Sequence, residues 1–176
     1  MKVRALLAFA VMLGGFALTA LAADEKKAEG KKYSGLVPFA QLAGEWEGKE
    51  MSGKKAELDL KVKYKVTAAG SAVMETIFPD TPQEMVTLIH PDGENLVLTH
   101  YCMLGNQPRM KAKAKSEGNQ VAFKFDSATN LKSENDPHMH EVTYTFVDKD
   151  TFKTEWTHYD GGKATMTVVF EFKRKK

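Results

Sequence analysis

The chain has 176 residues, with 25 basic and 23 acidic side chains, and its single cysteine is Cys102. This length suits one domain. Lysines alternate with acids along the chain instead of forming a basic patch, so we expect no nucleic-acid partner. One cysteine also excludes an intramolecular disulfide.

Residues 1–22 have the pattern of a secretory signal peptide. Lys2 and Arg4 precede an apolar run, and Ala20-Leu21-Ala22 supplies the small residues that signal peptidase accepts. The run is short for a bilayer span and charged residues follow it directly, so a retained anchor is the lesser alternative. We predict cleavage before residue 23, export to the periplasm or the extracellular space, and no stable membrane insertion afterwards. Without Lys2 and Arg4 the mature chain is formally neutral.

Residues 23–35 are charged and almost devoid of large apolar groups, which predicts a flexible lead-in. A single domain is expected over 36–176. From Leu58 to Phe172 apolar and polar residues alternate with a period of two, as in half-buried strands. Turn signals rich in Gly, Asn and Asp divide this domain. The predicted strands are 43–50, 57–67, 72–78, 84–90, 95–103, 108–115, 119–126, 139–147, 151–158 and 163–172.

So many consecutive one-sided hairpins predict an all-β fold, an up-and-down antiparallel β-barrel of about ten strands, because an open sheet would leave two long unpaired edges. Alternate loops then lie at alternate ends of the barrel. One end receives tight turns near 69–70, 92–93, 117–118 and 148–150. The other receives longer, more polar loops at 49–55, 79–83, 105–109, 127–137 and 159–163.

Strand parity predicts that histidine, cysteine and methionine side chains share the barrel interior near the end with the long loops. The reason is that directly opposed residues of an antiparallel pair share a face. Hairpins centred on these turn signals set the register. The predicted pairs are Met85–His100, Cys102–Met110, Tyr144–Thr154, Val142–Trp156 and His140–His158. The two histidines of the last pair would lie side by side.

The tripeptide Gly44-Glu45-Trp46, at the start of the first strand, resembles the Gly-x-Trp motif of the calycin superfamily of lipocalins, fatty-acid-binding proteins and nitrobindins. The absence of predicted long helices makes the helix-poor, nitrobindin-like branch the nearest match. The resemblance implies that a basic residue late in the last strand, here Arg174, packs across Trp46. Stretches such as "THYCMLGNQPRM" and "HMH" also resemble an uncharacterised group of exported bacterial proteins, which brings no known activity.

Polar groups gathered at one barrel mouth are costly to bury unless they are bound, paired or hydrated, and barrels commonly place ligand cavities there. We therefore predict binding of a small, mostly apolar ligand by a monomer. The alternative for each histidine is a satisfied core residue. The expected ligand-binding residues are Met85, His100, Cys102, Met110, His140, Tyr144, Trp156 and His158.

Three other kinds of site stay open. Zinc or copper would suit a set of imidazoles and a thiolate. Nitrobindin-like barrels imply haem, held by His140 or His158. An enzyme acting on a small molecule would use Cys102 with a histidine and a carboxylate such as Glu75, whose face depends on which of two registers the 69–70 turn adopts. The candidate metal ligands are His100, Cys102, His138, His140 and His158.

Overall fold

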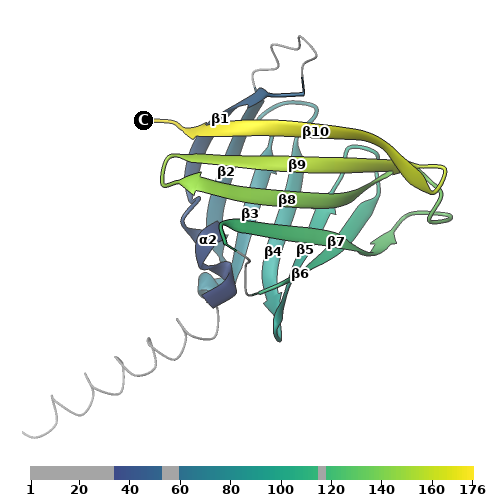
Figure 1. Ribbon diagram of the computed structural model, residues 1–176, viewed down its shortest axis with the longest axis horizontal. Coiled ribbons are helices and arrows are strands. Elements are labelled where there is room, and N and C mark those ends of the chain that lie inside the picture. Colours follow the sequence, from purple (N-terminus) through teal and green to yellow (C-terminus); the bar gives the residue numbers. More distant parts are fainter. Residues whose placement is uncertain (1–33, 53–59, 115–117) are drawn as a thin grey trace, which may run out of the picture. The chain divides into compact units, whose positions relative to one another are not determined.

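The computed structural model describes residues 34–52, 60–114 and 118–176, and it confirms the all-β barrel (Figure 1). Residues Gly35–Lys176 form one compact unit. The predicted signal peptide, the lead-in up to residue 33 and part of the predicted 117–118 turn lie outside the described residues. Within the described ranges, no helix is long and apolar enough to span a membrane.

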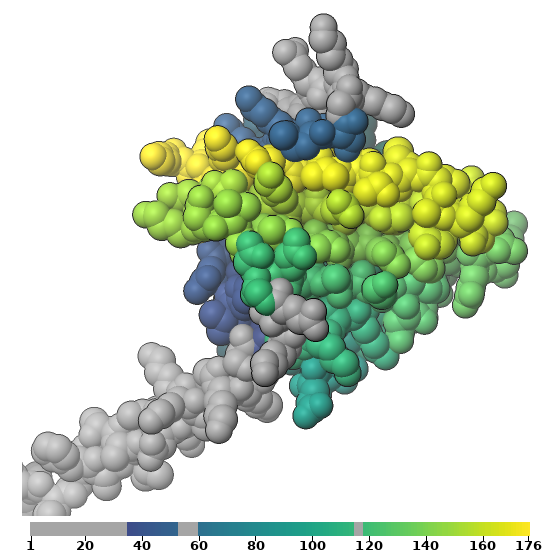
Figure 2. Space-filling model, in the orientation of Figure 1, coloured from purple at the N-terminus to yellow at the C-terminus, as the bar shows by residue number. Residues whose placement is uncertain are grey.

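The sheet is a meander in which each strand pairs antiparallel with its neighbours in sequence, and β1 closes the barrel against β10. In the space-filling view, β8, β9 and β10 form adjacent bands across one wall (Figure 2). Helical turns occur at η1 (Ser34–Leu36), α2 (Val37–Ala40) and η2 (Ala68–Gly70). The strands are β1 (Gly44–Glu50), β2 (Leu60–Thr67), β3 (Ala72–Ile77), β4 (Met85–Asp92), β5 (Asn95–Tyr101), β6 (Gln107–Lys113), β7 (Gln120–Thr129), β8 (His138–Asp148), β9 (Thr151–Asp160) and β10 (Lys163–Arg174).

The strand faces follow the predicted parity even where the register differs. The pairs Tyr144–Thr154 and Val142–Trp156 are confirmed. His100 lies opposite Thr87, two residues from the predicted Met85. Met110 lies opposite Leu98, four residues from the predicted Cys102. Since side chains alternate with period two, shifts by an even number of residues keep the same side chains inside.

A β-bulge in β8 makes the predicted His140–His158 pair wrong. Met139 lies opposite His158 and Glu141 opposite Thr157, so His140 is the extra residue between two regular pairs. One inserted residue reverses the parity of everything beyond it. Met139 therefore takes the place on the cavity wall that the alternation had assigned to His140.

The short segment before β1 closes the end of the barrel that carries the tight turns, where α2 lies in Figure 1. Leu36, Phe39 and Leu42 are buried, with Phe39 fully so. The Phe39 ring meets those of Tyr144 and Phe146 edge to face, with centroids 5.1 and 5.3 Å away. Such contacts add about 0.5–1.5 kcal/mol each to the burial term. The chain thus fills one end of its own barrel.

Arg174 packs across Trp46 at this closed end, as the calycin resemblance implied. The guanidinium carbon lies 4.2 Å from the centre of the indole ring. Arg174 donates hydrogen bonds to the carbonyls of Ala43 and Gln41, at 2.9 and 2.8 Å, and to that of Lys149. The indole N–H donates to the Leu42 carbonyl at 2.7 Å. One side chain therefore ties the end of β10 to the segment that enters β1.

Candidate functional site: a cavity at the barrel mouth

The opposite end of the barrel holds a cavity of about 340 Å³. Its wall is mostly apolar and comes from β2 to β5 and from β8 to β10, with the loop residues that follow β3 and β5. The methionines are Met85, Met103, Met139 and Met166, and the aromatic residues are Phe78, Trp156, Phe170 and Phe172. The polar members of the lining are Glu75, His100, Cys102, Thr154 and His158. Predicted site residues Met85, His100, Cys102, Trp156 and His158 are thus brought together around one space.

The methionines give this cavity an adaptable wall. Met103 and Met166 are 64% and 49% exposed, and Leu104 is 52% exposed, so the mouth itself is apolar. Thioether side chains are flexible and polarisable, and they repack around ligands of irregular shape. The sequence analysis did not single out Met103, Met139 or Met166. Met103 lies in the loop after β5, Met166 lies within β10 beside a register shift, and Met139 enters the wall only through the bulge.

Glu75, at the inner part of the cavity, is the centre of a buried polar network. Only 1% of it is exposed, and its carboxyl accepts hydrogen bonds from the hydroxyls of Tyr64 and Tyr144. The second of these bonds is 3.3 Å long. Burial raises the pKa of Glu75, because desolvation outweighs the lowering effect of the neighbouring hydroxyl groups. The η2 turn decides the register that points Glu75 inward, opposite Tyr64.

His100 joins this network through Thr87. The His100 Nδ1 atom lies 3.0 Å from the Thr87 hydroxyl oxygen, and the imidazole centroid lies 4.9 Å from that of Trp156. Burial lowers the pKa of His100 from 6.5 to about 4, so the ring is neutral near pH 7.

The Thr87 hydroxyl and the Nδ1 atom of His100 share one hydrogen bond, and the tautomer of the imidazole decides which of the two is the donor. Within the described part of the chain Nε2 has no hydrogen-bond partner.

Thr154 supplies a second polar group without a partner. The residue is 1% exposed and lines the cavity, and its hydroxyl has no hydrogen-bond partner among the described residues. A buried hydroxyl left unpaired costs about 1–3 kcal/mol. Thr154 lies directly opposite Tyr144, whose hydroxyl reaches Glu75. Thr154 is therefore the cross-strand neighbour of a residue of the Glu75 network, and its own oxygen is buried.

Cys102 is not activated as a nucleophile. The side chain is partly buried, and burial raises the pKa of its thiol. Reactive cysteines have depressed pKa values, because the thiolate is the nucleophile. Glu84 is exposed and accepts a hydrogen bond from the Asp80 amide outside the cavity.

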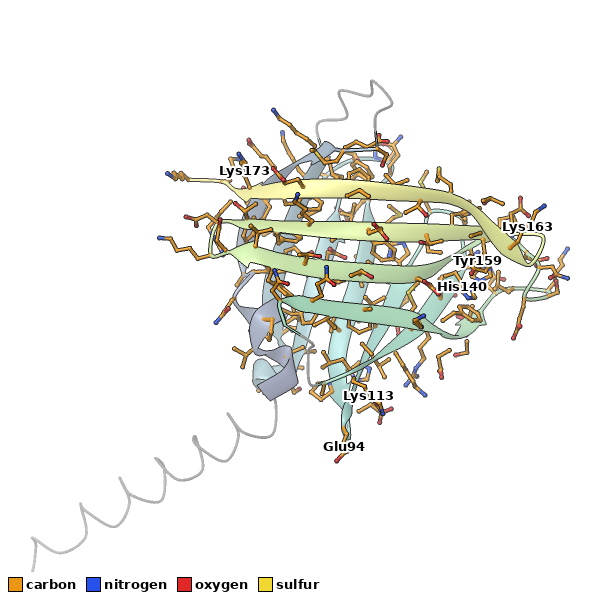
Figure 3. All side chains as sticks on the ribbon, in the orientation of Figure 1. Glu94, Lys113, His140, Tyr159, Lys163 and Lys173 are labelled. Atoms are coloured by element: carbon orange, nitrogen blue, oxygen red, sulfur yellow. The ribbon has the colours of Figure 1, made fainter. Side chains whose placement is uncertain are left out.

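The predicted histidine cluster divides into two separate groups. His138 is buried outside the cavity lining, with Nδ1 2.7 Å from the Asp136 carbonyl and Nε2 2.9 Å from Nδ1 of His140. The His140 ring stacks on Tyr159 with centroids 3.7 Å apart, and the two residues are labelled together in Figure 3. Phe125 stacks on the other side at 4.7 Å. These contacts are those of satisfied, structural imidazoles.

Two other predicted ligand-binding residues also lie outside the lining. Met110 is fully buried between β5 and β7. Tyr144 is connected to the cavity only through its hydrogen bond to Glu75, which lines it. Among the described residues no group of three or more His, Cys, Asp or Glu side chains is placed to hold a metal ion. At the mouth, the Nδ1 of His158 lies 2.9 Å from the Thr165 hydroxyl oxygen, which orients the ring. Of the two predicted haem ligands, His158 therefore lines the cavity, whereas His140 does not.

No family model matches this sequence, and no curated protein matches it. The fold is similar to the crystal structure of Rv2717c from M. tuberculosis, with a TM-score of 0.54 and 9% identity over 81% of this chain and 98% of that one. A DUF3598-family protein of unknown function from Nostoc punctiforme gives a TM-score of 0.48 and 11% identity over 78% of this chain and 49% of that one. At such identities the likeness to Rv2717c concerns the fold alone. Fold and cavity together define the class: a closed, ten-stranded, calycin-like barrel with a ligand-sized space at one mouth.

Proposed function

We propose that this chain is an exported protein that binds a small, mostly apolar molecule in the cavity at the open mouth of its barrel. The observation that carries the proposal is the cavity itself. Its volume of about 340 Å³ is within the range of small-molecule sites, and its wall is apolar with a few convergent polar groups. His100, Trp156 and the lining methionines would contact the ligand, and His158 lies at the entrance.

Packing in the rest of the barrel supports a retained cavity. Protein interiors are normally filled to the density of organic crystals. In this chain Phe39, Phe123 and Phe152 fill the other end, where all three are almost completely buried. A cavity of this size that carries an unpaired hydroxyl costs stability, so a function is the simplest reason for its presence. Export follows from the N-terminal sequence pattern and stays a prediction.

Titration of the purified mature protein with the neutral fluorescent dye N-phenyl-1-naphthylamine tests this proposal. Val168→Trp would fill the cavity, because Val168 lines it, whereas its neighbour Val169 points to the other face of β10. We expect Val168→Trp to weaken dye binding at least about tenfold, a loss of about 1.4 kcal/mol. The matched Val169→Trp control keeps its affinity within about twofold.

Equal dye affinity in both tryptophan variants would place the dye elsewhere and overturn the proposal. Mass spectrometry of an organic extract should also reveal a molecule that co-purifies with the wild type and is depleted in Val168→Trp. A Soret band in the visible spectrum that is lost in His158→Ala would reassign the cavity to haem. Stoichiometric zinc or copper would reassign it to a metal.

A further inference from the structure

Two methionines flank one histidine on the neighbouring strands β8, β9 and β10 at the cavity mouth (Figure 1). His158 of β9 lies directly opposite Met139 of β8 on one side and directly opposite Met166 of β10 on the other. All three line the cavity, so their side chains share one face. We propose that this row, Met139–His158–Met166, is a binding site for the soft monovalent ion Cu(I). The inference goes beyond the proposed binding of an apolar molecule and does not depend on it.

The sheet itself sets the spacing of the three groups. Directly opposed residues of an antiparallel pair have Cβ atoms about 4.5–5.5 Å apart. The sulfur of a methionine lies two bonds beyond its Cβ atom, on a flexible side chain. The sulfurs of Met139 and Met166 can therefore approach one ion from the two sides of the His158 imidazole, with no movement of the backbone.

Both strands beside His158 depart from regular pairing next to this row. In β8 the extra residue His140 follows Met139, so Met139 stands opposite His158 in its place. In β10 the extra residue is Thr165, and its hydroxyl oxygen lies 2.9 Å from Nδ1 of His158. β-Bulges re-aim side chains and are over-represented next to functional sites. One bulge thus sets a thioether beside the imidazole, and the other sets a hydroxyl against its Nδ1 atom.

The contact with Thr165 suits a histidine that binds a metal. Such histidines usually donate the N–H of one ring nitrogen to a neighbouring group and coordinate through the other nitrogen. Coordination through Nε2 requires the tautomer of His158 with the proton on Nδ1. The Thr165 oxygen can accept that proton, because its own hydroxyl donates to the His158 carbonyl at 3.3 Å.

The softness and the charge of the donors select Cu(I). Thioether sulfur prefers Cu(I), whereas zinc is held by imidazole, thiolate and carboxylate. Two thioethers and a neutral imidazole carry no charge, so a divalent ion would bring its whole charge to an apolar mouth without compensation. Glu75, the acidic residue of the described lining, already accepts hydrogen bonds from Tyr64 and Tyr144. None of the described lining residues is Lys or Arg, so no cationic side chain in the wall repels the ion.

The surroundings of the row suit a cation that enters and leaves. Trp156 lies two residues before His158 on the same face of β9, and aromatic faces, Trp above all, attract cations. On the outer side Met166 is 49% exposed, so the row is open to solvent. We therefore expect an exchangeable site, to which the ion must be added after purification.

Anaerobic titration of the full mature protein with Cu(I), in competition with the chelator bathocuproine disulfonate, tests the site. We expect one Cu(I) per chain, not displaced by excess zinc. Met139→Leu and Met166→Leu keep the volume and remove the sulfur, so each should weaken Cu(I) binding at least about tenfold. Met85→Leu is the matched control and should stay within about twofold, because Met85 lines the same cavity from β4, away from His158.

Wild-type Cu(I) affinity in both methionine variants would overturn the inference, as would the absence of Cu(I) binding by the wild type. Binding that is lost in Cys102→Ser but kept in Met139→Leu and Met166→Leu would also overturn it, because the thiol would then be the ligand. The dye titration is carried out without metal. A failure of dye binding therefore counts against the proposed function alone, and a failure of Cu(I) binding counts against this site alone.

NMR of protein labelled with [methyl-13C]methionine identifies the sulfurs directly, with Ag(I) as a probe that does not change its oxidation state. We expect Ag(I) to shift the methyl signals of Met139 and Met166, which are assigned by their absence from the leucine variants. The signal of Met110, fully buried outside the lining, should not move. Shifts confined to other methionines would overturn the assignment of this row.

Discussion

The two ends of this barrel are built from similar apolar side chains but are completed differently. At the closed end the chain supplies its own filling, with Phe39 against Tyr144 and Phe146. At the open end Met103 and Met166 remain largely exposed around a cavity. The contrast shows that apolar lining alone does not distinguish a core from a ligand site; what matters is whether the protein's own side chains occupy the space.

Polar groups show the same contrast. At the closed end Arg174 donates to three backbone carbonyls and covers Trp46. At the open end, Nε2 of His100 and the hydroxyl of Thr154 have no hydrogen-bond partner in the part of the chain that the structure describes. The polar groups of the closed end are therefore paired within the chain, whereas the open end keeps two polar atoms without a partner among the described residues.

The largest expected effect comes from emptying the closed end. Phe39→Ala should lower the free energy of unfolding by about 3–5 kcal/mol, because it removes a fully buried ring and leaves a cavity. Urea unfolding measures this loss, and Val37→Ala, at a position 46% exposed, should change stability by less than about 0.5 kcal/mol. A cost for Phe39→Ala below about 1 kcal/mol would contradict the contrast between the ends.

Lowering the pH should reveal the buried imidazole of the open end. His100 stays neutral in the folded protein down to a pKa of about 4, whereas in the unfolded chain it gains its proton near 6.5. Between these values the unfolded state binds more protons, so stability falls as the pH falls from 6.5 to 4, by up to about 3 kcal/mol for this residue. Urea unfolding at several pH values should show a shallower dependence in His100→Phe. An equal dependence in both proteins would remove His100 as its source.

Arg174→Met tests the closure of the barrel with a moderate expected effect. The substitution keeps the aliphatic length but removes the hydrogen bonds to Ala43 and Gln41 and the cation over Trp46. We expect a loss of about 2 kcal/mol in urea unfolding, with dye affinity unchanged. Lys173→Met, at an exposed neighbouring position, is the control and should cost less than about 0.5 kcal/mol. A similar small cost for Arg174→Met would show that β10 does not need this anchor.

The smallest effect on stability is expected at the mouth. Met166→Ala should change the free energy of unfolding by less than about 0.5 kcal/mol, since the side chain is 49% exposed, yet it should weaken dye binding. The matched Met110→Ala truncates a fully buried methionine and should cost about 2–5 kcal/mol. Comparable costs at both positions, measured by thermal or urea unfolding, would mean that the mouth is packed as tightly as the core.

Alternation in the sequence was enough to predict the barrel and the faces of its strands. The His100 register differs from the predicted one by two residues and the Met110 register by four, and both side chains still point inward. A register shift by an even number of residues leaves the face of each side chain unchanged. Errors in the predicted turn length therefore did not change which of these side chains were predicted to point inward. The packing of Arg174 over Trp46 was predicted from the resemblance to calycins, and the structure contains it.

The parts of the site that could not be predicted depend on single-residue irregularities and on partners distant in sequence. Nothing in the alternation marks the bulge that moves His140 off the cavity wall. Glu75 finds its tyrosine donors 11 and 69 residues away, on different strands. The unpaired state of Thr154 is a property of its surroundings, which parity does not describe.

Because β8 contains one extra residue, a deletion of one residue in this strand would change which side chains line the cavity. Deleting Met139 would restore regular pairing and set His140 opposite His158, because the strand would then contain one residue for each position of β9. The apolar wall would become one with two facing imidazoles, the arrangement from which metal sites are commonly built. The loss of a single codon would therefore exchange a methionine on the cavity wall for an imidazole that faces His158.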